Sequence, residues 1–202
     1  MNKNIKLFLS TALIEMINYK VNINLLRTKQ LVMSGDLKCL GYFDLPATFA
    51  VAMKSSQKDW FQIFVHEYCH FRQWIDKAPV FIDVDNIHGM SNYDSWLEHK
   101  KDLTKKQIIA CTRGCQALEL YCEKRVVKII KDYDLPFNIP QYIQKANVYV
   151  LFYNYAMKHR KWYTKISPYK SKEVLETVPN MWLKSYKKMT KEYENAITNH
   201  VI

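Results

Sequence analysis

The chain has 202 residues, a formal net charge of +11, and 49% apolar residues. This length suits a single domain with its own core, and no run approaches the ~18 apolar residues that predict a membrane span. Only 4 glycines and 6 prolines are available for tight turns, which disfavours turn-rich folds and indicates a globular protein rich in helices.

The first 20 residues begin with lysines and run into an apolar stretch, which superficially resembles a signal peptide. Glu15 interrupts the stretch and no small-x-small cleavage site follows, so we expect an amphipathic first helix. The five cysteines are odd in number and lie mostly at helical spacing in apolar runs. This pattern is typical of buried free thiols in a reducing compartment, and it favours a cytoplasmic protein.

Three short segments that follow have strand character. They mix β-branched, aromatic and alternating apolar residues, and turn signals at Ser34-Gly35-Asp36 and at Pro46 separate them. The segments are residues 29–33, 40–45 and 48–54. We expect them to form a small antiparallel sheet.

A helix is predicted next, from Ser56 to about Asp76. Ser56 can cap the first N–H groups, and Asp59 three residues later can reach back as in a capping box. Apolar residues lie all round this helix, so we expect other elements to enclose it.

The remaining chain reads as an irregular segment followed by helices. Residues 78–96 carry Pro, Asp, His and Gly and indicate a loop or lid. Helices are expected from Thr104 to before Pro136, over 139–163, and over 178–199. The predicted fold is thus a mostly helical α+β domain over residues 1–202, made of a sheet with one helix (1–76), an irregular loop (77–103) and a helical part (104–202).

The helix after the sheet contains His66-Glu67-x-x-His70. Residues at i and i+4 share one face of a helix, so both imidazoles can point at a single metal ion such as Zn²⁺. Glu67 lies beside them, where its carboxylate can take a proton from a metal-activated water. Without a metal, two histidines and a glutamate in so apolar a helix would cost several kcal/mol unless other groups satisfied them.

This motif resembles that of the zincin metallopeptidases. The wider run HEYCHFRQW followed by LELYCEKR also resembles small metallopeptidase-like proteins encoded by bacteriophages, over roughly the half from Phe64 to Tyr163. The resemblance implies zinc-dependent hydrolysis of a peptide or protein substrate with Glu67 as general base, in the host cytoplasm or in a virion.

Several residues are candidates for the third metal ligand. One zincin branch has a glycine where this chain has Gln73 and a ligand at the position of Asp76, but in a continuing helix Asp76 lies about 240° from His70. A loop histidine, His88 or His99, is a second option.

The gluzincin arrangement offers a third option. There, a glutamate on a later helix binds the metal and an acid one turn further on supports the first histidine. In the ELYCE segment the resemblance gives these roles to Glu119 and Glu123, with glutamate replacing the usual aspartate, and the two roles could be exchanged. For the residue that stabilises the oxyanion, the candidates Tyr149, Tyr153, His159 and Arg160 stay open.

Two other classes of function remain compatible with these residues. One is a virion-associated or binding protein with a structural zinc site. The other is a basic nucleic-acid-associated protein, although the dispersed lysines and the lack of RNP, helix-turn-helix and zinc-finger patterns favour a solvated surface without a specific nucleic-acid partner. The sequence leaves the substrate and the oligomeric state open.

Overall fold

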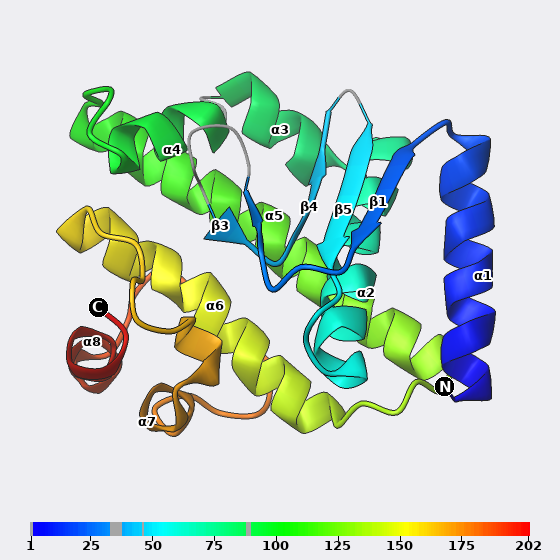
Figure 1. Ribbon diagram of the computed structural model, residues 1–202. Coiled ribbons are helices and arrows are strands. Elements are labelled where there is room, and N and C mark those ends of the chain that lie inside the picture. Colours follow the sequence, from blue (N-terminus) through cyan, green and yellow to red (C-terminus); the bar gives the residue numbers. More distant parts are fainter. Residues whose placement is uncertain (1, 33–37, 46, 88–89) are drawn as a thin grey trace. The chain divides into compact units, whose positions relative to one another are not determined.

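The structure is a computed structural model that describes residues 2–32, 38–45, 47–87 and 90–202, without the side chains of residues 84–87. It is mostly helical with two small sheets, which confirms an α+β protein (Figure 1). The chain forms two compact units: residues 1–77 with 128–136, and residues 78–127 with 137–202.

The first unit begins with helix α1 (Lys3–Asn18), as the sequence predicts. The Asn2 side chain accepts a hydrogen bond from the Asn4 N–H at 2.7 Å and so caps the helix. One face of α1 is buried, and its Phe8 makes edge-on contacts with four aromatic rings, those of Phe61, Phe64, Tyr68 and Tyr133. Aromatic packing therefore holds α1 against the motif helix.

The sheet of this unit is mixed and not wholly antiparallel. Its order is β1 (Asn22–Leu26), β5 (Thr48–Ala52), β4 (Gly41–Asp44), with β1 parallel and β4 antiparallel to β5. A separate antiparallel pair joins β2 (Leu31–Val32) to β3 (Lys38–Cys39).

Strand β1 is a strand that the sequence analysis did not predict. Asn22 and Asn24 are poor strand formers, and the segment becomes a strand through its hydrogen bonds to β5. The other strands fall within or next to the expected segments. The expected turns at Ser34-Gly35-Asp36 and at Pro46 include positions outside the described residues.

Helix α2 (Gln57–Ile75) carries the His-Glu-x-x-His motif and has the expected bounds. The Ser56 hydroxyl oxygen accepts from the Asp59 N–H at 3.2 Å, while its O–H donates to the Asp59 carboxylate at 2.7 Å. The helix packs on β4 and β5, where Phe49 meets Phe64 edge-on with ring centroids 5.0 Å apart. Alternate residues of β5 point to opposite faces, so Ala50 and Ala52 pack instead with Leu31.

In the second unit, the segment expected to be irregular is largely helical. It forms α3 (Pro79–Ile87) and α4 (Met90–Leu97). Pro79 suits the first turn of a helix, where its missing N–H is not needed. Tyr93 and Trp96 of α4 are buried in a cluster that includes Cys111, Cys115 and Tyr153. This tertiary burial outweighs the weak helix propensity on which the expectation of a loop rested.

Helices α5 (Lys105–Asp132) and α6 (Ile139–His159) lie close to their expected bounds. The Thr104 hydroxyl accepts from the Gln107 N–H at 3.3 Å, and the Gln107 side chain accepts from the Thr104 N–H at 2.9 Å. This reciprocal capping sets the start of α5. Helix α6 ends at His159 because Arg160 takes a left-handed conformation.

The expected terminal helix over residues 178–199 is only partly formed. A short 3₁₀ turn (Pro168–Lys170) and α7 (Lys172–Leu175) come first, and α8 spans Lys191–His200. Residues 178–190 are irregular because buried amides bind their carbonyls: Asn147 donates to Pro179 and Met181, and Asn154 donates to Tyr186.

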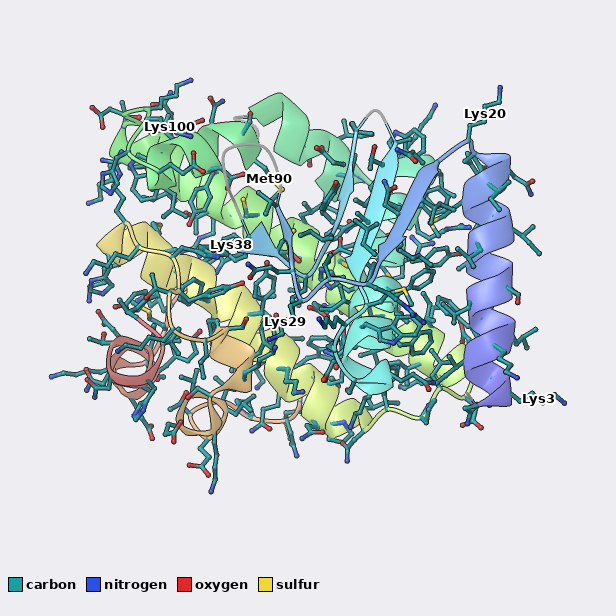
Figure 2. The ribbon with its side chains drawn as sticks, viewed as in Figure 1. Lys3, Lys20, Lys29, Lys38, Met90 and Lys100 are labelled. Atoms are coloured by element: carbon teal, nitrogen blue, oxygen red, sulfur yellow. The ribbon has the colours of Figure 1, made fainter. Side chains whose placement is uncertain are left out.

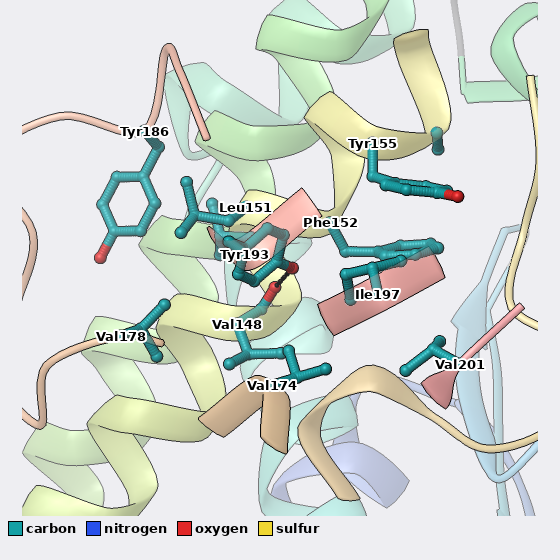
Figure 3. Close-up of a cluster of buried hydrophobic side chains, with 12 residues drawn as sticks. Val148, Leu151, Phe152, Tyr155, Val174, Val178, Tyr186, Tyr193, Ile197 and Val201 are labelled. Atoms are coloured by element: carbon teal, nitrogen blue, oxygen red, sulfur yellow. Dashed lines mark hydrogen bonds between the residues drawn. The ribbon is translucent and has the colours of Figure 1, made fainter. Parts of the chain in front are cut away.

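Helices α6, α7 and α8 enclose a core of aliphatic and aromatic side chains (Figure 3). Tyr193 of α8 is fully buried, and its hydroxyl donates to the Val148 carbonyl of α6 at 2.7 Å. Ile197, one turn later, is fully buried in the same cluster. The C-terminal helix is therefore an integral part of the core of the second unit.

Lysines are spread over the surface. Figure 2 shows Lys3 and Lys20 projecting away from opposite ends of α1, and Lys100 projecting from the end of α4. Within the part of the chain that the structure describes, no helix is both long enough and apolar enough to cross a membrane.

Candidate metal centre

The two motif histidines converge on one point. His66 is half-buried and His70 is buried; their rings are 4.8 Å apart at an angle of 78°, and their Nε2 atoms are 3.1 Å apart. Two imidazole nitrogens bound to one tetrahedral Zn²⁺ at about 2.0–2.1 Å lie about 3.3–3.4 Å apart. The observed spacing fits a shared metal ion after a shift of a few tenths of an ångström.

Gln73 forms a hydrogen bond with the Nδ1 side of the His70 ring. Its side chain is fully buried, and its Oε1 lies 2.7 Å from His70 Nδ1. An amide oxygen only accepts hydrogen bonds, so this contact requires a proton on Nδ1, and in a neutral ring the lone pair then lies on Nε2. A neutral imidazole binds a metal through the ring nitrogen that carries the lone pair, which here is Nε2.

Glu67 is buried on α2 where the edge strand β4 passes close to the helix. A Cβ built on Gly41 of β4 would lie 2.9 Å from Glu67 Cγ and 2.5 Å from Ile63 Cγ2. Only a residue without a side chain permits this approach. Burial, together with the negative charge of Glu67, raises the pKa of the Cys39 thiol to about 11, so this neighbour stays protonated at neutral pH.

Asp76, one of the alternative third ligands, is engaged elsewhere. It is exposed at the end of α2 and accepts from Arg72 at 2.9 Å. Arg72 also donates to Glu15 of α1, which accepts from the Tyr68 hydroxyl as well. Glu15, the residue that interrupts the N-terminal apolar run, thus ties α1 to α2.

Neither loop histidine gains support as a ligand. His99 is exposed and has a φ of 62° two residues after the end of α4, a left-handed conformation that suits the end of a helix. His88 lies outside the described residues.

Glu119 and Glu123 are both buried on α5, so they are not part of an ordinary solvated face. The Tyr142 hydroxyl of α6 donates to Glu123, and the Tyr153 hydroxyl lies 3.5 Å from Glu119. Arg113, also on α5, donates to Asn154 at 2.9 Å and to the Lys187 carbonyl at 2.8 Å.

The four candidates for oxyanion stabilisation fall into two groups. Burial raises the pKa of both Tyr149 and Tyr153 well above the usual value, with Glu119 adding to the effect, so both phenols remain neutral donors. His159 binds Glu194 at 2.6 Å, and Arg160 donates to the Trp96 carbonyl at 2.7 Å. These last two side chains serve to join secondary-structure elements.

The sequence analysis missed two residues that shape the motif helix. Gln73 appeared only as the occupant of a position where other zincins have glycine, although it lies three residues after His70 and so on the same helical face. Gly41 carries no signal in the sequence, because nothing in its local pattern predicts the approach of α2.

His66, Glu67 and His70 belong to the first unit, whereas Glu119 and Glu123 belong to the second. The roles of the two glutamates as metal ligand and as support for His66 therefore stay predictions. No family model, no curated protein and no solved structure matches the chain, so these residues and their chemistry are the basis for any function assigned to it.

Proposed function

We propose that this protein is a zinc-dependent metallopeptidase. His66 and His70 would bind the metal, Glu67 would act as general base, and α5 would supply the third protein ligand. The substrate would be a peptide or a protein, and the five free thiols suit a reducing compartment such as the cytoplasm.

The observation that carries this proposal is the convergence of the His66 and His70 Nε2 atoms at 3.1 Å beside a buried carboxylate. Both Nε2 atoms can bind one metal ion, and the free energy of metal binding would add to the stability of the fold. The hydrogen bond from His70 to Gln73 adds support, because metal-binding histidines usually donate their second N–H to a fixed acceptor.

Bound Zn²⁺ would supply Lewis acidity, lowering the pKa of a water molecule to about 7 and polarising a substrate carbonyl. Glu67 would take the proton from that water and pass it to the leaving amine. Its burial beside β4 limits the freedom of its side chain, which favours a fixed position for proton transfer.

For the third ligand we propose Glu119, with Glu123 orienting His66, on the strength of the gluzincin resemblance. The burial of both carboxylates in the second unit supports a specific role for each. Cys122 lies on α5 between them, is also buried, and is a residue type that binds zinc. It is therefore the alternative ligand that a test must distinguish.

A peptide substrate suits strand β4. This strand lies at the edge of its sheet, and Gly41 brings it within contact distance of Glu67. Edge strands can bind an extended peptide through main-chain hydrogen bonds. A peptide bound in this way would have its backbone close to the general base.

The primary test combines metal analysis with a peptidase assay. The purified protein should contain about one zinc per chain, and it should cleave a fluorescent casein substrate until a chelator removes the metal. His66→Ala and His70→Ala should each abolish stoichiometric zinc. His99→Ala is the matched control, because this exposed histidine should leave the zinc content unchanged.

Glu67→Gln separates catalysis from metal binding. It should retain the zinc and lose hydrolysis, because the amide cannot accept the proton. Stoichiometric zinc without any cleavage by the native protein would favour a structural zinc site in a binding or virion-associated protein. Full zinc retention in the double histidine variant would refute the metal site itself.

The third ligand can be identified by comparing three variants on α5. Glu119→Ala should remove most of the zinc, whereas Glu123→Ala should weaken binding by only about 10- to 100-fold. Cys122→Ser should leave the zinc content unchanged. If Cys122→Ser lost the metal and Glu119→Ala kept it, the gluzincin assignment would be wrong.

A further inference from the structure

We infer that Gln73 is a positioning residue that fixes the tautomer of His70 and sets the strength of metal binding with a neutral acceptor. The part of this inference that concerns zinc rests on the proposed function, whereas the part that concerns the tautomer does not.

The hydrogen-bond geometry gives the two neutral histidines different roles in their mutual contact: His70 accepts and His66 donates. His70 Nδ1 lies 2.7 Å from Gln73 Oε1, so the proton of a neutral His70 ring resides on Nδ1. The 3.1 Å contact between the two Nε2 atoms also needs a proton, and that proton must then come from His66. His70 is already in the metal-binding form, whereas His66 must move its Nε2 proton before it can bind a metal.

The position of Gln73 in the fold strengthens its preference for one tautomer of His70. It lies three residues after His70 on the same helix, so both side chains occupy one face of α2. Its side chain has no exposed surface. Water therefore does not reach the Gln73 amide oxygen in the folded protein.

The amide also differs chemically from the usual acceptor. A carboxylate behind a metal-bound histidine raises the basicity of the ring, whereas a neutral amide orients the ring without adding charge. Gln73→Glu should therefore tighten zinc binding relative to the native protein. Gln73→Met, which has a similar volume but no strong acceptor, should weaken zinc binding by about 10- to 100-fold.

The tautomer can be measured on the metal-free native protein. Long-range ¹H–¹⁵N NMR of the histidine side chains reports which ring nitrogen carries the proton. His70 should appear with the proton on Nδ1, and this preference should disappear in Gln73→Met. A native His70 protonated on Nε2 alone would overturn the inference, whatever zinc does.

Zinc titration of the same variants supplies the second readout. The matched control is Gln116→Met, because Gln116 is also buried and donates to the carbonyls of Val150 and Tyr186 in the other unit. The expected order of zinc affinity is Gln73→Glu, then native and Gln116→Met together, then Gln73→Met. Equal losses of affinity in Gln73→Met and Gln116→Met would show a general effect on folding and refute the positioning role.

These measurements distinguish a failure of the proposed zinc peptidase from a failure of the proposed role of Gln73. If His70 shows the expected tautomer but the protein binds no zinc, the proposed function fails and the tautomer assignment stands. If zinc binds stoichiometrically but Gln73→Met changes neither the tautomer nor the affinity, the role of Gln73 fails and the metal site stands.

Discussion

Replacing Gly41 with alanine tests how tightly the edge strand packs on the motif helix. The new Cβ would lie 2.5 Å from Ile63 Cγ2, 2.9 Å from Glu67 Cγ and 3.2 Å from the Ala50 carbonyl oxygen. Carbon atoms normally pack about 3.5–4.0 Å apart, so strand and helix must separate by about 1 Å. Ala50 belongs to the neighbouring strand and pairs with Tyr42, which limits movement of β4.

The expected cost of Gly41→Ala is about 1–3 kcal/mol in the free energy of unfolding, the usual range for overpacking. In a strand without such a contact, the same change would stabilise the protein by about 0.5–1 kcal/mol, because alanine loses less backbone entropy on folding. A loss of stability in Gly41→Ala would therefore indicate close packing of β4 on α2, and a gain would indicate that the strand has room for a side chain. Urea unfolding followed by circular dichroism measures it.

A double-mutant cycle locates the clash. Ile63→Ala removes the nearest carbon, so the double variant should be more stable than the sum of the single costs predicts, by about 1 kcal/mol. Ser10→Ala on the exposed side of α1 is a control that should change stability by less than about 0.5 kcal/mol. A stabilising Gly41→Ala, or strict additivity with Ile63→Ala, would refute the packing argument.

Three further predictions concern other parts of the molecule. Burial, and secondarily the charge of Glu98, raises the pKa of Asp94 from 3.8 to about 6. Its protonated form thus favours the folded state below about pH 4, and this advantage is lost as the pH rises through 6. Asp94→Asn should therefore increase the free energy of unfolding at pH 7.5 but not at pH 4, by less than about 1 kcal/mol because solvent screens this exposed group; an equal gain at both pH values would contradict the assignment. Tyr142→Phe removes the hydroxyl that donates to buried Glu123 and should cost about 1–3 kcal/mol in urea unfolding, whereas the same change at exposed Tyr121 should be neutral; equal effects would refute a specific role for the hydroxyl. Binding of duplex DNA, measured by fluorescence anisotropy, should be weak and should collapse between 50 and 200 mM salt, and tight, sequence-selective binding that tolerates salt would restore the nucleic-acid alternative.

Local rules predict the helix that bears the motif. Ser56 and Asp59 supply capping chemistry within four residues, and no proline lies between Ser56 and Pro79 to interrupt the helix. The i, i+4 spacing of His66 and His70 then brings their rings together, whatever the other elements do. Short-range geometry of one helix is sufficient for both features, which is why the sequence alone could indicate them.

Tertiary packing decides the features that depend on distant residues. Strand β1 exists through its pairing with β5, and α4 is stabilised by burying Tyr93 and Trp96 against α5 and α6. The segment before α8 is irregular because amides of α6 bind its carbonyls. Each of these outcomes adds long-range contacts that outweigh a weak local preference.

The same division applies to the candidate site. The sequence singled out His66, Glu67 and His70 as candidate site residues, and the gluzincin resemblance added Glu119 and Glu123. Burial of those two acids and the close approach of Gly41 to α2 depend on which elements pack together, and no local pattern encodes this. Helical periodicity could have placed Gln73 beside His70, but the environment of α2 made it a fully buried acceptor.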